Sequence, residues 1–160
     1  MKHPAIHGLY AITDPALIPD RQLLPAAEAA LRGGARLLQY RDKTATPAQR
    51  RHRASQLQTL CRQYGALFLV NDDPALAADI EADGVHIGQS DGGIARARQR
   101  LGPGKIIGVT CHGDLTLAEQ AAEGGADYVA FGRFFPSRTK PQAPPADSAI
   151  LQQARKRLAI

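Results

Sequence analysis

The chain has 160 residues, of which 44% are hydrophobic and 22% are charged. This length suits one domain, and the composition excludes a disordered chain and a membrane-spanning one, because the longest apolar runs, such as ALFLV, are far shorter than a bilayer. The net charge of +5 favours an anionic partner, whether a polymer or a small phosphate ester.

Short apolar segments alternate with longer amphipathic ones along the whole chain. The N-terminus contains no apolar run of signal-peptide length, so we expect a cytoplasmic protein. The pattern predicts strands at about 8–13, 35–41, 66–71, 83–87, 105–110 and 127–132, and helices at about 21–33, 47–64, 73–81, 91–101, 114–124 and 147–158. Thr46-Pro47 and Asp73-Pro74 are typical helix starts. Repeated strand and helix units predict an α/β fold with a parallel sheet.

The residues that follow each predicted strand are the candidate site, because ligands bind at the carboxyl ends of parallel strands. After the second strand, Gln39, Arg41 and Lys43 alternate with Leu38 and Tyr40, so we expect the three donors to point to one face. Burying such donors is costly unless an anion meets them, and a phosphate group is the obvious anion. The alternative is a solvated strand end.

Acidic side chains follow the next two predicted strands. Asp72 comes after Asn71 and is available as an oxygen ligand if Asp73 caps the following helix. Asp91 could be a second ligand, or it could cap the helix that begins near it. Together the two carboxylates could hold one Mg²⁺ against a diphosphate. Hydroxyl and basic side chains follow the last two strands: Thr110, His112, Ser137, Thr139 and Lys140.

Six motifs, in order from about residue 8 to 140, resemble the thiamin phosphate synthase family and its relatives, the thiazole tautomerases and the synthase-like domains fused to Nudix hydrolases. The motifs are GLYAITD, QYRDK, VNDD, DGVHIGQSD, IGVTCH and GADYVAFGRFFPSRTK. The resemblance implies a TIM-type (β/α) barrel that joins hydroxymethylpyrimidine diphosphate to hydroxyethylthiazole phosphate and uses Mg²⁺. Loss of diphosphate would give a pyrimidine methyl cation, which the thiazole nitrogen captures.

The resemblance also implies a role for each matching position. The pyrimidine and its diphosphate would contact Gln39, Arg41, Lys43 and Asn71, while Asp72 and Asp91 would hold the metal. The rest of the pocket would come from Thr110, Ser137, Thr139 and Lys140, with Thr110 and Lys140 as catalytic residues. No covalent nucleophile is required, so we expect Cys61 and Cys111 to be bystanders.

Three features depart from the family pattern. Thr110 stands where the family usually has Ser, and Arg133 and Phe134 replace a Gly-Pro-aliphatic continuation. The chain ends where a seventh strand would begin, so we expect one domain over residues 1–160 with six of the eight β/α units. Such a sheet has two open edges, and we expect the chain to form homo-oligomers through them.

Three alternatives remain open. His112 could serve as the acid and base of a metal-independent thiazole tautomerase, although Asp72 and Asp91 favour diphosphate chemistry. The chain could also be a non-catalytic partial barrel that acts only within a larger assembly. Basic clusters on three predicted helices could bind nucleic acid, but they lack interleaved aromatic residues, so we favour a solvated helical face. The clusters are Arg50, Arg51 and Arg53; Arg96, Arg98 and Arg100; and Arg155, Lys156 and Arg157.

Overall fold

Strands and helices alternate through the computed structural model, which describes residues 6–136 and 142–160. The strands are β1 (Leu9–Ile12), β2 (Ala35–Tyr40), β3 (Leu67–Asn71), β4 (Gly84–Ile87), β5 (Ile106–His112) and β6 (Tyr128–Phe131). The helices are α1 (Asp20–Arg32), α2 (Pro47–Gln63), α3 (Pro74–Asp79), α4 (Gly93–Leu101), α5 (Leu115–Glu123) and α6 (Ala149–Arg157). Every expected element is confirmed, with small shifts at its ends.

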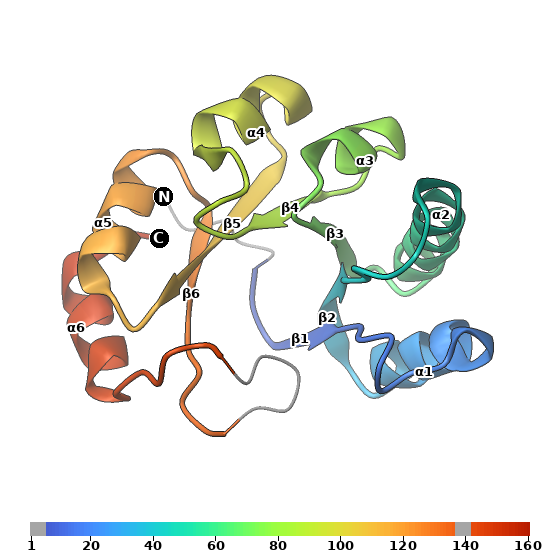
Figure 1. Ribbon diagram of the computed structural model, residues 1–160, viewed down its shortest axis with the longest axis horizontal. Helices are drawn as coiled ribbons and strands as arrows, with labels where there is room; N and C mark the ends of the chain where they lie inside the picture. The colour runs from blue at the N-terminus through green and yellow to red at the C-terminus, as the bar shows by residue number, and fades with distance from the viewer. Residues whose placement is uncertain (1–5, 137–141) are drawn as a thin grey trace.

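The six strands form one parallel sheet in the order β1-β2-β3-β4-β5-β6. Because each crossover returns to the neighbouring strand with the same hand, the helices all cover one face and the sheet curls around its other face. Figure 1 shows the helices as an outer arc around the strands. Within the described residues β1 and β6 are the edge strands, so the fold is a curled half-barrel.

Both faces of the four central strands, β2 to β5, are mostly buried, which explains their nearly continuous apolar sequences. Side chains such as Leu38, Phe68 and Ile107 pack outward against the helices in the larger core. Leu37, Leu69 and Ile106 point inward and form a smaller cluster in the interior. Alternation along β2 therefore places Leu38 and Tyr40 on the helix side and Gln39 on the interior side, as expected.

Local capping explains where several helices begin. Thr46 and Gln49 form a capping box at the start of α2, and the Asp73 carboxylate accepts a hydrogen bond from the backbone N–H of Leu76 at 2.9 Å. Asp91 is different, because the N-cap of α4 is Gly92 in a left-handed conformation. The interpretation of Asp91 as a helix cap is therefore wrong, and its carboxylate is available for another role.

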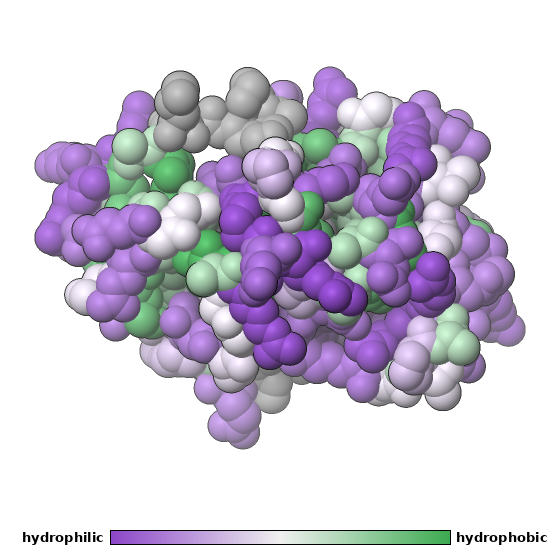
Figure 2. Space-filling model, turned by 90° about the horizontal axis from the view of Figure 1, so that it is seen from above, coloured by the Kyte–Doolittle hydropathy of each residue, from purple (hydrophilic) through white to green (hydrophobic). Residues whose placement is uncertain are grey.

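The face seen in Figure 2 is mostly hydrophilic, with apolar side chains visible in patches between hydrophilic ones. Many of the arginines in the three basic clusters form ion pairs: Arg50 with Asp73, Arg51 with Asp79, Arg53 with Asp20 and Asp42, Arg98 with Asp127, and Arg157 with Glu119. These pairs lower the charge offered to a nucleic acid. None of the helices in the described part of the chain has the length and apolar character needed to cross a membrane.

Candidate active site

A cavity of about 480 Å³ opens where five strands end. Its polar lining comes from the ends of β1, β2, β4, β5 and β6 and from the segments that follow them. These side chains are Tyr10, Thr13, Asp14, Gln39, Arg41, His86, Thr110, His112, Tyr128 and Arg133. Apolar residues such as Ile12, Val129 and Phe131 complete the wall. The cavity therefore combines an apolar lining with a few polar groups, as small-molecule sites usually do.

The floor of this cavity is a chain of hydrogen bonds between buried side chains. Gln39 Nε2 donates to the Tyr10 hydroxyl at 2.7 Å, and the hydroxyls of Tyr10 and Tyr128 lie 2.8 Å apart. The Tyr128 hydroxyl bonds to His86 Nδ1 at 2.8 Å, and His86 Nε2 bonds to Thr110 Oγ1 at 2.7 Å. Burial raises the pKa of both tyrosines, so their hydroxyls stay neutral.

Arg41 stands at the side of the same cavity and is held there by the loop after β1. Its backbone N–H donates to Thr13 Oγ1 at 2.9 Å, and its Nη1 lies 3.3 Å from Asp14 Oδ2. The Nε of Arg41 is buried and has no hydrogen-bond partner among the described residues. A buried N–H without a partner is costly, so this guanidinium is suited to an incoming anion.

Lys43 turns away from Gln39 and Arg41, because β2 ends at Tyr40 and strand alternation no longer applies beyond it. Its Nζ lies 3.1 Å from Asp72 Oδ2, at the end of β3. The expectation that all three donors share one face is thus wrong for Lys43. The amine instead reaches the acidic pair at the neighbouring strand ends.

Asp72 and Asp91 lie side by side and both line a second cavity of about 920 Å³. The Asp91 Oδ2 accepts a hydrogen bond from the backbone N–H of Gly88 at 2.7 Å, and Asp72 has a left-handed backbone with φ of 60°. Burial and the neighbouring Asp72 carboxylate raise the pKa of Asp91. Burial also opposes charge on Asp72, but hydrogen bonds from Lys43 and Asp91 hold its pKa below the ordinary value. The two carboxylates can therefore share a proton.

A divalent cation fits this pair, since it could replace the shared proton between two hard oxygen ligands. Within residues 6–136 and 142–160, no group of three or more His, Cys, Asp or Glu side chains gathers in a metal-binding arrangement. Two carboxylates suit Mg²⁺, which usually keeps several waters and takes its remaining ligands from substrate oxygens.

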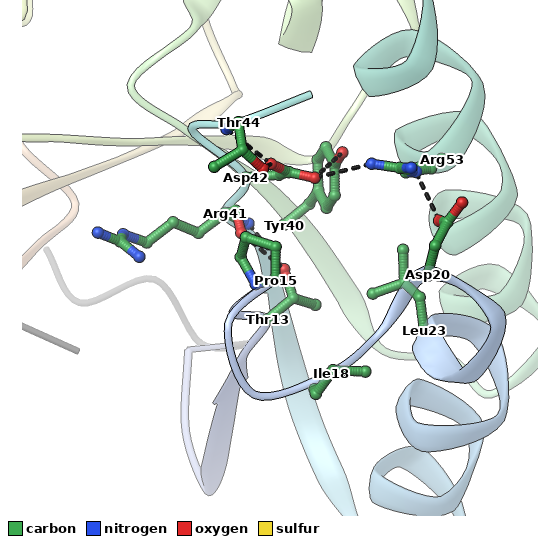
Figure 3. Close-up of a pocket in the computed structure, with 10 residues that line it drawn as sticks. All are labelled: Thr13, Pro15, Ile18, Asp20, Leu23, Tyr40, Arg41, Asp42, Thr44 and Arg53. Carbon is green, nitrogen blue, oxygen red and sulfur yellow. Dashed lines mark hydrogen bonds and ion pairs between the residues drawn. The ribbon is translucent and has the colours of Figure 1, made fainter. Parts of the chain in front are cut away.

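Asp42 holds the loop that carries Arg41 and Lys43 (Figure 3). Its Oδ1 accepts hydrogen bonds from the backbone N–H and the hydroxyl of Thr44, both at 2.9 Å, and from the backbone N–H of Ala45 at 3.0 Å. Its Oδ2 lies 2.9 Å from Arg53 Nη1 on α2. Burial opposes the charge on Asp42, but these bonds and Arg53 hold its pKa below the ordinary value.

Arg53 extends this network to the start of α1. Its Nε lies 2.6 Å from Asp20 Oδ1. A small cavity of about 160 Å³ lies between the loop after β1 and the loop after β2. Figure 3 shows the Arg41 side chain pointing away from Arg53, toward the interior of the half-barrel. Burial raises the pKa of Tyr40, which lies beside Asp42, to about 12. Asp42, Arg53 and Asp20 thus hold the loop after β2 from the side opposite the cavity of about 480 Å³.

The remaining expected residues fall into three groups. Thr110 and His112 line the cavity of about 480 Å³, and Asn71 ends β3 next to Asp72. Ser137, Thr139 and Lys140 lie outside the residues that the structure describes. Cys61 and Cys111 are buried free thiols, and burial raises their pKa to about 12 and about 11, so both stay unreactive.

Sequence reasoning missed three side chains of the cavity floor: Tyr10, His86 and Tyr128. Each occupies an inward position of an otherwise apolar strand, where a polar group needs a partner. A search for polar residues at the inward positions of buried strands could have found them.

Comparisons with known proteins agree on one family. Residues 9–160 match the family model described as thiamine monophosphate synthase. The chain is 75% identical over 149 residues to the thiamine-phosphate synthase of Alcanivorax borkumensis, and the match covers 93% of this chain and 69% of that protein. It is 53% identical over 148 residues to the thiamine-phosphate synthase of Marinobacter nauticus, covering 92% of this chain and 67% of that protein.

Two solved structures resemble the chain to different degrees. A thiamine phosphate pyrophosphorylase from Pyrococcus furiosus is 37% identical with a TM-score of 0.74, covering 82% of this chain and 62% of that chain. A truncated 3-deoxy-D-arabino-heptulosonate 7-phosphate synthase from Thermotoga maritima, at 16% identity and a TM-score of 0.60, shares the fold alone. The chain spans about two thirds of the length of these curated relatives.

Proposed function

The chain belongs to the thiamine monophosphate synthase family, and on that basis we propose that it joins hydroxymethylpyrimidine diphosphate to hydroxyethylthiazole phosphate and releases diphosphate. One observation carries this proposal. Lys43, Asp72 and Asp91 follow three neighbouring strands and interact with one another, at the same carboxyl edge of the sheet as the cavity that Arg41 lines. Such a group can neutralise a diphosphate while the cavity binds a ring.

The hydrogen-bonded floor supports binding of the pyrimidine. Amide, hydroxyl and imidazole groups can donate to and accept from ring nitrogens and an amino group. Because the pKa of Tyr10 and of Tyr128 is raised, the floor does not supply an anion that would trap a carbocation. The floor is therefore compatible with a methyl cation that forms when the bond to diphosphate breaks.

The donors on the loop after β2 support binding of the diphosphate. Arg41 offers a guanidinium whose Nε has no partner among the described residues, and Lys43 adds a flexible amine at the rim. Asp72 and Asp91 would hold Mg²⁺, which when bound supplies positive charge to the departing diphosphate. In this proposal Asp42 and Arg53 keep the loop in place, so that the donors are ordered before the substrate arrives.

We propose Thr110 and Lys140 as the catalytic residues. The Thr110 hydroxyl bonds to His86 and lines the cavity, where it can orient the reacting methylene group. Lys140 would act on the diphosphate from the loop after β6, and it lies outside the described residues.

A test of this function measures diphosphate release with both substrates, with and without Mg²⁺. We expect release to require the metal, and we expect Asp72→Asn and Asp91→Asn to lower kcat/KM on the order of a hundredfold each, because one ligand charge is lost. Asp79→Asn is the matched control, since Asp79 is an exposed carboxylate paired with Arg51 on the helical surface. Release that continues at full rate after chelation would contradict the proposal.

The position of His112 keeps a thiazole tautomerase as a second candidate. Its side chain lines the cavity, and its backbone is left-handed with φ of 52°, a conformation that often marks functional positions. A metal-independent isomerisation that is lost in His112→Gln would favour this function. Binding of both substrates without turnover would favour a non-catalytic partial barrel instead.

A further inference from the structure

The hydrogen bonds on the floor of the cavity of about 480 Å³ form one chain that connects five strands. The chain begins at Gln39 on β2, passes through Tyr10 on β1 and Tyr128 on β6, and continues through His86 on β4 to Thr110 on β5. Each bond is 2.7 or 2.8 Å long, and all five side chains line the cavity. The direction of these bonds therefore decides which end of the chain offers a donor to a ligand.

The ring of Tyr128 is held firmly in the middle of this chain. It packs edge-on against the ring of Tyr10, with centroids 6.0 Å apart, and stacks on the ring of His86, with centroids 5.6 Å apart. In the sheet, Gly108 on β5 lies between His86 and Tyr128. A Cβ at this position would overlap the Tyr128 ring. Glycine at position 108 thus lets the Tyr128 hydroxyl reach His86 Nδ1.

Proton counting gives the chain two possible directions. Gln39 Nε2 can only donate, so the Tyr10 hydroxyl accepts from it in both. In the first direction Tyr10 donates to Tyr128, which donates to His86 Nδ1. The N–H at His86 Nε2 then donates to Thr110. In the second direction these three bonds are reversed, and Thr110 donates to His86. The ring nitrogen of His86 that carries the proton therefore distinguishes the two directions.

The hydrogen bond from Gln39 favours the first direction. A hydroxyl that accepts a hydrogen bond becomes a stronger donor, so Tyr10 is polarised to donate to Tyr128. Burial raises the pKa of both tyrosines, so both keep the proton that this direction needs. In this direction the hydroxyl proton that the chain itself does not use is that of Thr110, and Thr110 lines the cavity. This proton is then available to a ligand.

We propose that His86 and Tyr128 are positioning residues, which hold the Thr110 hydroxyl as a hydrogen-bond donor to the oxygen that leaves with the diphosphate. The identity of this oxygen rests on the proposed function. When the C–O bond breaks, its electron pair moves to this oxygen, so a donor there stabilises the transition state more than the bound substrate. Thr110 keeps its proton in this step. Its β-branched side chain is restricted at χ1, and the bond to His86 Nε2 restricts it further.

The tautomer of His86 tests the direction of the chain without any substrate. We would record ¹⁵N NMR spectra of the ligand-free chain with labelled histidine and identify the His86 signals by their loss in His86→Gln. We expect Nε2 to carry a proton in the parent. Tyr128→Phe removes the donor to Nδ1 and should shift His86 toward the other tautomer. A bare Nε2 in the parent, which would make Thr110 the donor to His86, would overturn the proposal.

Tyr64→Phe is the matched control for Tyr128→Phe. It also removes one tyrosine hydroxyl, but from an exposed hydrogen bond to Glu28 at 2.8 Å. We expect it to leave the ¹⁵N signals of His86 and the rate of diphosphate release unchanged. Thermal unfolding of each variant shows whether the fold is kept. An equal change of the His86 signals in both variants would contradict a specific role of Tyr128.

Kinetics test the effect on the reaction. We expect Tyr128→Phe to lower kcat about three- to tenfold and to change the KM of each substrate less than about twofold, because the donor acts mainly in the transition state. His86→Gln, whose amide N–H can reach toward Thr110, should keep more activity than His86→Leu. Equal activity of these two variants, or a loss in Tyr128→Phe that is confined to KM, would refute the positioning role.

The two readouts separate this inference from the proposed function. If the parent releases diphosphate and Thr110→Val does so at the same rate, the proposed function stands and the positioning role is wrong. If the parent releases no diphosphate, the proposed function fails and the assignment to the leaving oxygen fails with it. A protonated Nε2 would still establish Thr110 as a donor toward the cavity.

Discussion

Arg53→Met tests whether the loop after β2 depends on a buried ion pair. The Asp42 side chain is 5% exposed and the Arg53 side chain is 18% exposed, and their closest N and O atoms are 2.9 Å apart. Without Arg53, the Asp42 carboxylate keeps its hydrogen bonds from Thr44 and Ala45 but loses its counter-charge. Breaking a fully buried pair costs about 3–5 kcal/mol.

The expected cost here is smaller, about 2 kcal/mol, because these hydrogen bonds remain and the cavity beside Arg53 can admit water. For a chain of this size, that loss lowers Tm by roughly 4–8 °C, measured by circular dichroism together with urea unfolding. The variant should also bind Mg²⁺-diphosphate more weakly, since Arg41 and Lys43 stand on the released loop.

Arg51→Met is the matched control on the same helix. Arg51 and Asp79 also lie 2.9 Å apart, but their side chains are 58% and 50% exposed, so removal should cost no more than about 0.5 kcal/mol. Adding Asp42→Asn to Arg53→Met should recover part of the loss, because a neutral amide needs no counter-charge. Equal losses in Arg53→Met and Arg51→Met would refute the reasoning, as would a double variant less stable than Arg53→Met.

Three further outcomes are expected. The pKa of Asp42 is lowered in the folded chain, so the ionised Asp42 stabilises the fold above the ordinary pKa of 3.8, and this stabilisation is lost as the pH falls through the folded pKa. Without Arg53 the folded pKa is lowered less, so urea unfolding at several pH values should show that Arg53→Met loses stability at a higher pH than the parent. Tyr128→Phe removes the hydroxyl that bonds to both Tyr10 and His86 at 2.8 Å and should cost about 1–3 kcal/mol in urea unfolding, and a loss below 0.5 kcal/mol would argue against a continuous network. We also propose self-association through the edges of the sheet. Sedimentation should show oligomers, and Ile12→Lys, at an exposed position of the edge strand β1, should dissociate them. A monomeric parent chain would contradict this proposal.

The order of strands and helices could be predicted from the sequence because its causes are local. Short apolar runs, and caps such as Thr46 and Asp73, act over a few residues and determine where each element lies along the chain. The family was also recognisable, since its motifs are short and ordered, and the comparisons confirm it. Gln39 and Arg41, which were expected on one face, do line one cavity.

Lys43 and Arg53 show where local reasoning stops. Strand alternation did not predict the position of Lys43, because β2 ends at Tyr40 and the Lys43 amine forms an ion pair with Asp72. Arg53 was assigned to a solvated helical face, yet it contacts one carboxylate at the start of α1 and another in the loop after β2. Neither contact leaves a periodic signal, because each depends on how one element packs against another.

The sequence by itself determined the parallel α/β architecture and which polar side chains stand at the strand ends. The tertiary structure alone decided which of these meet: Tyr10 and Tyr128, 118 positions apart, share a hydrogen bond, and Asp72 and Asp91 share one cavity. The physical reason is one of range. Backbone geometry governs neighbours along the chain, whereas the curl of the sheet sets the distance between one strand end and another.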